Sequence, residues 1–319
     1  YYRHMPRMRF LFTIALLLLL TGFIACDITV ENPAPDPTEN PQFANWLIPR
    51  NEIINRGTPD DIIPAIDNPE FEVTGRVDYL EDADLVLGVS VNGEFRAYPV
   101  PILNYHEVVN DVFRNHEIMI AYSPLSGSSA AWDRDDLNGI SSNFGISEFI
   151  YKSNHILYDR ETKSHWVPML FECVNGQLEG FDADQYEIVE SSWGNWKTMF
   201  QGSRVMQPPT GSGFNYNIDP FASYRNSDTI HFFTQPLDDR LVRKEKVHAI
   251  IVRERAKAYR FDSFQEPITV IMDNFQGLSV VVVGSQEGRY IVSFESRIPG
   301  GAELEFSVNN DAPNIVAKQ

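Results

Sequence analysis

Cysteine is scarce in this sequence, with Cys26 and Cys173 as the two representatives among 319 residues. Two cysteines cannot form a disulfide scaffold or a site of four thiolates around a metal ion. Basic side chains are also few, because 26 Lys and Arg face 44 Asp and Glu and leave a formal net charge of −18. Since binding to phosphates relies on an excess of Lys and Arg, we expect no nucleic-acid partner.

A hydrophobic run long enough to span a bilayer comfortably is absent from the N-terminal region. The apolar stretch over residues 10–20 falls short of the roughly 20 residues that a spanning helix needs. Three arginines precede it and small residues follow it, which is typical of a secretory signal. The sequence Ile-Ala-Cys at residues 24–26 resembles a bacterial lipobox, in which Cys26 is diacylated and becomes the first mature residue. The alternative is an ordinary cleaved signal with an incidental cysteine.

We therefore expect a lipoprotein signal peptide over residues 1–25 and a lipid anchor, including palmitate, on Cys26. Two acyl chains hold a protein stably on a membrane where one does not. This places the protein in the bacterial cell envelope, on the extracytoplasmic or periplasmic side. Residues 26–45 are rich in proline, which favours an extended tether between the anchor and the rest of the chain.

Beyond the tether, the chain has the composition of a folded protein, with 43% hydrophobic and 12% aromatic residues over its whole length. Residues 46–319 are expected to form a single globular domain. Residues 85–91 and 94–98 flank Asn92-Gly93 and predict a β-hairpin with a type I′ turn. Further strands are predicted at residues 117–122, 128–132, 154–158 and 164–167. Trp193 and Trp196 lie at helical spacing within residues 191–201, which favours a helix with a buried stripe over a sugar-binding platform.

A weak internal repeat relates two parts of the chain. Residues 86–98 align without gaps on residues 247–259, with four identities and an apolar strand about twenty residues later in each copy. The repeat halves would cover about 62–180 and 235–308. The expected fold is thus β-rich α+β with short helices, and the two β halves, if the repeat is genuine, share one core.

A series of motifs in this chain resembles the uncharacterised bacterial family known as domain of unknown function 3179. The similarity runs from about residue 46 to about residue 295. In order, the motifs are Ile-Pro-Ala-Ile-Asp-Asn-Pro at 63–69, Arg-Ala-Tyr-Pro at 96–99, Leu-Asn-Tyr-His-Glu-Val-Val-Asn-Asp at 103–111, Ser-Asn-His-Ile-Leu-Tyr-Asp-Arg at 153–160, the tryptophans 166, 193 and 196, Leu-Asp-Asp-Arg-Leu at 237–241 and Lys-Glu at 244–245.

The chain departs from the family at residues 123–127. Members of the family carry Cys-Pro-Leu-Cys-Gly, which implies thiol redox chemistry or a soft-metal site, whereas this chain has Ser-Pro-Leu-Ser-Gly. A serine hydroxyl stays protonated, forms no disulfide and is not a soft ligand for zinc or copper. Cys173 lies far away in the sequence and offers no replacement. We expect this chain to have lost the chemistry that the family motif implies.

Three kinds of site are considered for the remaining polar residues. Ser123 or Ser126 could be a nucleophile with His106 as its base and Asp111 or Glu107 orienting the base, although the Gly-x-Ser-x-Gly elbow of hydrolases is missing and a serine-rich turn more often bonds its own backbone. A transition metal could bind His106, His155 and His165 with Glu107 or Asp159, or these histidines could be ordinary buried ones. A small polar ligand could bind Asn154, Tyr158, Asp159 and Arg160, or these residues could pin a turn.

The leading hypothesis is a binding or accessory module rather than an enzyme. Its binding residues would be His106, Asn154, Tyr158 and Asp159, around the turn at residues 123–127. The partner would be an unknown small molecule or an envelope protein. No cofactor is predicted, and a transition metal at His106 or His155 is left open. The alternative is a metal-dependent or serine-nucleophile enzyme centred on His106 and Ser126. Acidic pairs such as Asp135-Asp136 are read as solvated surface.

Overall fold

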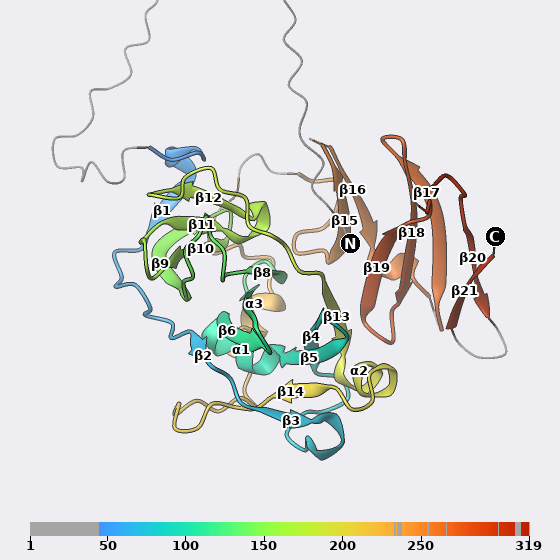
Figure 1. The fold of residues 1–319 in the computed structure, drawn as a ribbon, viewed down its shortest axis with the longest axis horizontal. Coiled ribbons are helices and arrows are strands. Elements are labelled where there is room, and N and C mark those ends of the chain that lie inside the picture. The colour runs from blue at the N-terminus through green and yellow to red at the C-terminus, as the bar shows by residue number, and fades with distance from the viewer. Residues whose placement is uncertain are drawn as a thin grey trace, which may run out of the picture. The chain divides into compact units, whose positions relative to one another are not determined.

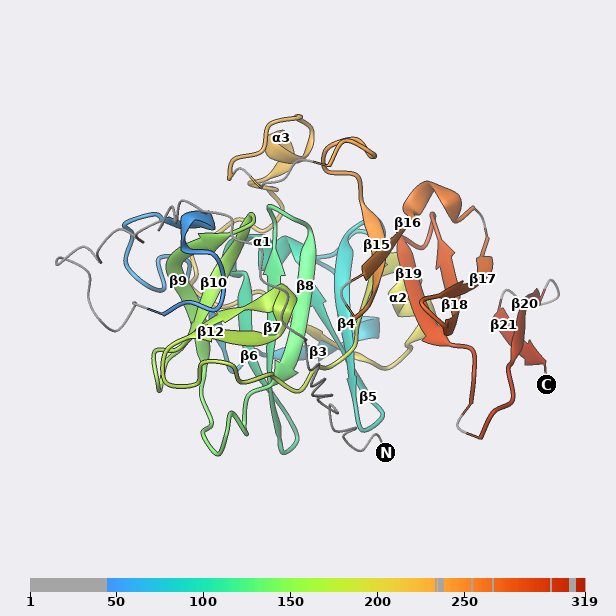
Figure 2. The same ribbon diagram turned by 90° about the horizontal axis from the view of Figure 1, so that it is seen from above.

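The chain folds into β-sheets joined by short helices, as Figures 1 and 2 show. This computed structural model describes residues 45–232, 234, 238–253, 255–265, 267–298, 300–309 and 314–318. The predicted signal peptide, the lipidation site Cys26 and the tether up to residue 44 lie outside the described residues. No helix in the described part is long and apolar enough to cross a membrane. The predicted β-rich α+β fold with short helices is confirmed.

Three sheets make up the first part of the described chain. The strands of the first sheet, in spatial order, are β1 (Ile53–Asn55), β9 (Phe144–Tyr151), β10 (Asn154–Asp159), β11 (His165–Val167) and β12 (Glu172–Asn175). The second sheet contains β2 (Ile66–Asp67), β6 (Val108–Phe113), β7 (His116–Ser123) and β8 (Ser128–Asp133). The third contains β13 (Ile188–Ser192), β4 (Leu85–Val91), β5 (Glu94–Pro99), β14 (Arg204–Met206) and β3 (Phe71–Val73).

Later strands form three smaller sheets. They are the hairpin β15 (Val247–Val252) and β16 (Arg255–Arg260), the three-stranded meander β17 (Thr269–Phe275), β18 (Leu278–Ser285) and β19 (Tyr290–Glu295), and the hairpin β20 (Glu305–Asn309) and β21 (Asn314–Lys318). The α-helices are α1 (Val100–His106), α2 (Trp193–Met199) and α3 (Ala222–Arg225), and the 3₁₀ turns are η2 (Arg50–Glu52), η3 (Thr74–Arg76), η4 (Pro168–Leu170) and η5 (Phe261–Ser263).

Strand β7 contributes to two hydrophobic cores, one on each face of its sheet. Ile118 and Ile120 pack with residues of β4 and β5, whereas Met119 and Ala121 pack with residues of β9, β10 and β11. Figure 2 shows β7 and β8 between β10 and β4. A strand buried on both faces has an uninterrupted apolar sequence, which is why residues 118–122 show no polar alternation.

The two tryptophans of α2 are buried, as their spacing predicts. Trp193 and Trp196 are 2% and 1% exposed and pack with side chains of β4, β5 and β14. Ser192 caps the helix by accepting a hydrogen bond from Asn195 N at 3.3 Å. Gly88 of β4 makes this packing possible, because a Cβ atom at this position would lie 1.9 Å from the Trp196 ring.

The predicted hairpins and the turns between them are also present. Asn92 and Gly93 join β4 to β5 with positive φ angles of 50° and 78°, as a type I′ turn requires. β10 and β11 pair antiparallel on either side of a polar turn. The strand predicted at residues 117–122 is β7, and β8 is the strand that returns from it.

The predicted repeat remains a prediction, but two pairs of units share their register. Hairpin β4–β5 has the same register as hairpin β15–β16, 161 residues later. Val86 pairs with Pro99 in the first hairpin, and Val247 pairs with Arg260 in the second. Meander β6–β7–β8 matches β17–β18–β19 at an offset of 162, as shown by the pairs Ile118–Asp133 and Val280–Glu295.

One buried contact recurs in both units. Asp111 accepts hydrogen bonds from Tyr98 at 2.6 Å and from Arg96 at 2.8 Å. At the corresponding place, Asp273 accepts from Tyr259 at 2.7 Å and from Lys257. In each unit an aspartate on the meander thus ties it to a tyrosine and a cation on the hairpin.

Candidate functional site

The turn at residues 123–127, here called the serine turn, joins β7 to β8. Ser123, the first residue of the turn, pairs with Ser128, the first residue of β8. Gly127 N donates to Ser123 O at 2.8 Å and closes the turn. Gly127 has a φ of 66°, in the left-handed region that glycine adopts without steric cost. Proline and glycine therefore build this loop locally, and the serines are presented at its base.

Two serine hydroxyls of this region meet the side chain of Asn154, the first residue of β10. Ser126 Oγ and Ser128 Oγ lie 2.8 and 2.9 Å from Asn154 Oδ1 and 2.7 Å from each other. The two serine hydroxyls carry one proton each, so only two of these three contacts can be hydrogen bonds at the same time. Ser123 Oγ donates instead to Ser153 O at 3.3 Å. The structure thus brings Asn154 together with the serine turn, two groups that the sequence analysis placed at one site.

Beneath the turn lies a buried pair of ionisable side chains. His155 Nδ1 is 2.5 Å from Glu107 Oε2, and the two residues are 6% and 3% exposed. Because a carboxylate only accepts hydrogen bonds, the Nδ1 proton is donated to Glu107. Glu107 therefore occupies one imidazole nitrogen, and any ligand or base chemistry of His155 falls to Nε2.

Glu107 reaches this position through an unusual backbone conformation. It follows α1 directly, with a φ of 58°, while its N–H donates to Leu103 O at 2.9 Å and ends the helix. Its own carbonyl accepts from Tyr122 N at 2.8 Å, which ties the residue to β7. A non-glycine residue with positive φ is uncommon, and such residues concentrate at functional sites.

A small pocket connects these groups. Its volume is about 10 Å³, enough for about one water molecule. Apolar side chains from β7, β8, β9 and β10 and the η4 turn form the rest of its wall. The polar residues among its lining are Glu107, Ser123, Ser128, Ser129, Asn154 and His155. We call this the serine-turn pocket.

His106 is not among the residues that line the serine-turn pocket. Its Nδ1 donates to Pro64 O at 2.7 Å, and its Nε2 lies 2.7 Å from the Tyr216 hydroxyl. Burial lowers the pKa of His106, which favours the neutral ring. Both nitrogens therefore have protein partners, and the ring packs against Phe214 at a centroid distance of 5.5 Å. The structure does not bring His106 to Ser126.

Asp159 pins a turn. It is fully buried and accepts hydrogen bonds from Thr162 N at 2.6 Å, Ser164 N at 3.2 Å and Trp166 Nε1 at 3.1 Å. The sequence analysis left two roles open for this residue, ligand binding and stabilisation of a turn, and the structure gives Asp159 the second role. Asp111, considered as a group orienting His106, is held by Arg96 and Tyr98 instead.

Tyr158 and Arg160 bind residues of β2 and of the loop that precedes it. The Tyr158 hydroxyl donates to Asp61 Oδ2 at 2.7 Å, and burial together with this bond raises the pKa of Tyr158 to about 12. Arg160 bonds to Asp67 at 2.7 Å. Neither residue lines the serine-turn pocket.

The remaining candidates lie in the interior. His165 packs between Trp46 and Phe149, and burial lowers its pKa to about 4. Burial raises the pKa of Cys173 to about 12, so its thiol does not form a thiolate near neutral pH. In the described part of the chain, the predicted trio of His106, His155 and His165 does not form a group with metal-binding spacing; the group that does is His116, Asp133 and Asp135.

The sequence analysis missed the pairing of Glu107 with His155. It named both residues in the candidate metal site, but it considered Glu107 as an orienting group only for His106, its neighbour in the sequence. The left-handed conformation at Glu107 turns the two side chains to different surroundings. The proximity of Asn154 and His155 to the serine turn had no local signal, because it depends on how β7 and β10 pack.

Comparison with known proteins gives one match. The sequence pattern of the family described as "Protein of unknown function (DUF3179)" matches residues 60–314. No curated protein and no solved structure matches the chain. The match covers most of the chain and confirms the resemblance predicted from the motifs. The chain therefore belongs to the DUF3179 family.

Proposed function

We propose that this protein is a lipid-anchored extracytoplasmic binding module that holds a small polar ligand at the serine-turn pocket. The observation that supports it is the convergence of the Ser128–Asn154 contact and the buried Glu107–His155 pair on one pocket. Hydroxyl, amide and imidazole groups in a partly apolar wall fix the orientation of a small ligand. The anchor would be Cys26, and residues 26–45 would be the tether.

The size of the pocket limits what enters it. A volume of about 10 Å³ accommodates a single hydroxyl, carbonyl or ammonium group. The rest of the ligand would lie outside, against the exposed side of the serine turn. Met169, which lines the pocket and is 44% exposed, offers an apolar contact there. The proposed ligand class is a small organic molecule with one terminal polar group.

The directions of the serine hydroxyls favour binding over nucleophilic catalysis. Among the described residues, Ser126 and Ser128 bond to each other and to Asn154, and Ser123 bonds to Ser153 O. A serine nucleophile needs its hydroxyl on the imidazole that removes the proton. Here the hydroxyls are directed to amide and carbonyl oxygens.

A second candidate function is a serine-nucleophile enzyme with His155 in the role first considered for His106. Glu107 and His155 provide a general base with an orienting carboxylate, and Ser123 and Ser128 line the same pocket. A rotation of one hydroxyl toward Nε2 would complete the arrangement. In both candidates the redox chemistry implied by the family's Cys-Pro-Leu-Cys-Gly is lost with the two thiols.

Ligand-observed NMR on the purified full chain tests the binding proposal. The probes are a panel of amino acids, hydroxy acids, sugars and small amines. Binding should weaken about fivefold in Asn154→Ala and in Ser128→Ala, as expected for one lost hydrogen bond each. Asn217→Ala, an exposed asparagine outside the pocket, is the matched control. A panel with no binder that depends on Asn154 contradicts the proposal.

Two further measurements address the anchor and the alternative. Palmitate labelling in a bacterial host should mark the wild-type chain and not Cys26→Ser. A fluorophosphonate probe distinguishes the serine-nucleophile enzyme from the binding module. In the enzyme, the serine oxygen would attack the phosphorus of the probe, fluoride would leave and His155 would take the serine proton. Labelling that is lost in His155→Gln and in Ser123→Ala or Ser128→Ala would establish the enzyme and overturn the module.

A further inference from the structure

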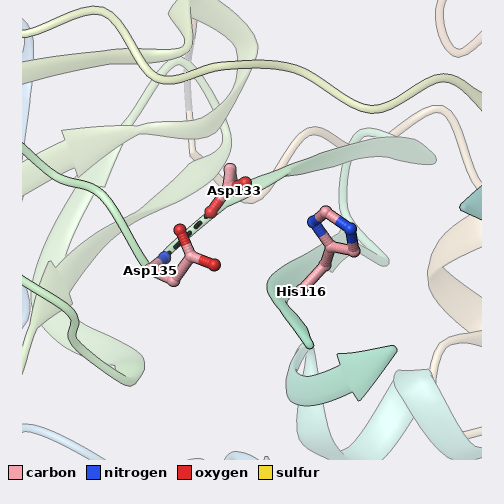
Figure 3. Close-up of side chains that lie close together, drawn as sticks. All are labelled: His116, Asp133 and Asp135. Atoms are coloured by element: carbon pink, nitrogen blue, oxygen red, sulfur yellow. Dashed lines mark hydrogen bonds between the residues drawn. The ribbon is translucent and has the colours of Figure 1, made fainter. Parts of the chain in front are cut away.

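A second cluster of ligand-type side chains lies at the other end of the β7–β8 hairpin. His116 is the first residue of β7, Asp133 is the last of β8, and Asp135 follows two residues later. Asp133 pairs with Ile118, so the pleat places His116 and Asp133 on the same face of the sheet. One ligand atom from each of the three residues lies within 4.8 Å of the others. Figure 3 shows the imidazole ring directed toward the two carboxylates.

We propose that His116, Asp133 and Asp135 bind a divalent transition-metal ion through one imidazole nitrogen and two carboxylate oxygens. This mixed donor set suits ions such as Zn²⁺ and Mn²⁺, with water in the remaining positions. Ligand atoms at about 2.1 Å from a tetrahedral ion are roughly 3.4 Å apart. Small rotations of these side chains, which are not fully buried, would close the present separation.

The charges around the cluster favour a cation. Asp135 N donates to Asp133 Oδ1 at 2.9 Å, and this turn brings two carboxylates together. In the described part of the chain, no Lys or Arg forms an ion pair with either aspartate; the intervening Arg134 is directed to Glu117 at 2.7 Å. A bound ion would place a positive charge directly between the two carboxylates.

The contacts around the cluster hold its side chains in place. Asn92 Nδ2, in the β4–β5 turn, lies 2.9 Å from His116 Nε2, and because an amide nitrogen only donates, Nε2 accepts and Nδ1 carries the proton of the neutral ring. An ion bound at Nδ1 would move that proton to Nε2, and a flip of the Asn92 amide would then turn Oδ1 to accept from Nε2–H. The Tyr186 hydroxyl donates to Asp133 Oδ2 at 3.3 Å. Partners of this kind, one step outside the ligands, fix ligand orientation and tune affinity.

A comparison within the chain indicates that the strand pairing does not require these residues. Meander β17–β18–β19 has the same register as β6–β7–β8 at an offset of 162 residues. Its residues at the equivalent positions are Leu278, Glu295 and Arg297, which cannot form the same donor set. The cluster is therefore an addition to the hairpin and not part of its folding.

Isothermal titration of the untagged, chelator-treated full chain with Zn²⁺, and Mn²⁺ titration followed by electron paramagnetic resonance, test the site. We expect one ion per chain, bound at least about tenfold more weakly by Asp133→Asn, Asp135→Asn and His116→Gln. Asp184→Asn is the matched control: it removes one negative charge next to the cluster, where Asp184 O accepts from Asp133 N at 2.8 Å, and should change affinity less than threefold.

Wild-type protein that binds neither ion would overturn the proposal, as would binding that all three variants retain. The Asp→Asn changes preserve side-chain shape, and thermal unfolding without metal checks that each variant is folded. If His116→Gln does not fold, Mn²⁺-induced broadening of the His116 imidazole signal in wild-type protein decides the point. The serine-turn pocket lies at the opposite end of β7, so the Asn154→Ala variant should bind metal normally.

Discussion

Glu107 and His155, which are 48 residues apart in the sequence, meet at 2.5 Å in the protein interior beneath the serine turn. One side chain comes from the end of α1 and the other from β10. A buried charge is tolerated when its partner is in place and is costly when the partner is removed. This pair therefore fixes α1 to the β10 strand and also forms the wall of the pocket.

Removing the carboxylate of this pair should cost far more than changing its charge. Glu107→Ala leaves the imidazole buried without its acceptor, with an expected loss of about 3 kcal/mol in the free energy of unfolding. Glu107→Gln keeps an acceptor and should lose about 1–2 kcal/mol. Urea denaturation measures both. The half-exposed pair Lys152–Glu52, tested with Glu52→Gln, should lose less than about 1 kcal/mol; equal losses at the two pairs would contradict this view.

Stability should depend on pH through His165. Its pKa is lowered by burial to about 4 in the folded chain and is about 6.5 in an unfolded chain. As pH falls below 6.5, the unfolded state takes up a proton that the folded state does not, so stability present above pH 6.5 is lost progressively toward pH 4.

The comparison variant for this effect is His165→Gln, which does not titrate. Between pH 7 and pH 4, wild-type protein should lose about 3 kcal/mol more stability than the variant. Denaturant titrations at several pH values provide the measurement. Parallel curves for the two proteins would show that His165 is protonated equally in both states.

Gly88 should tolerate no side chain. Gly88→Ala places a Cβ atom 1.9 Å from the Trp196 ring, and the resulting overpacking should cost about 1–3 kcal/mol. Gly75→Ala is the matched control, because a Cβ atom there meets nothing within 4 Å and the backbone needs no positive φ. Thermal denaturation of both variants is the measurement. An unchanged Gly88→Ala midpoint would mean that α2 moves freely on its sheet.

Two thiols introduced into the serine turn should form a disulfide. In the double variant Ser123→Cys with Ser126→Cys, the closed turn holds the two positions near each other, as a bridge requires. Mild oxidation should remove both new thiols from the double variant, whereas each single variant should keep its own. Thiol titration reports the result, and the high pKa of buried Cys173 keeps it from exchanging. Two persistent free thiols would show that the turn is too open.

Local patterns in the sequence predicted the elements that local physics determines. Asn92-Gly93 predicted the hairpin turn because both residues adopt positive φ. The apolar residues of 117–122 predicted a strand, and the structure adds that this strand is buried on both faces. The serine turn was predicted from its proline and glycine. The helical spacing of Trp193 and Trp196 correctly identified a buried face.

Which histidine faces the serine turn could not be predicted from local patterns. His106 and Glu107 are adjacent in the sequence, yet the positive φ at Glu107 directs them to different partners. A single backbone angle decides this, and glutamate gives no sign of it in the sequence. The sequence analysis did not name His116 or Asp133 and interpreted Asp135 as solvated surface, since the proximity of the three residues follows from the pairing of β7 with β8 and not from their spacing.

The burial of β7 on both faces has a consequence for how the family can diversify. A polar or bulky replacement at any of its central positions would disturb two cores at once. The two ends of the strand, at Ser123 and at His116, are the places where a side chain can be replaced with little loss of stability. A replacement at either end would leave the two cores intact, so we expect new chemistry in this scaffold to arise at the ends of the strand.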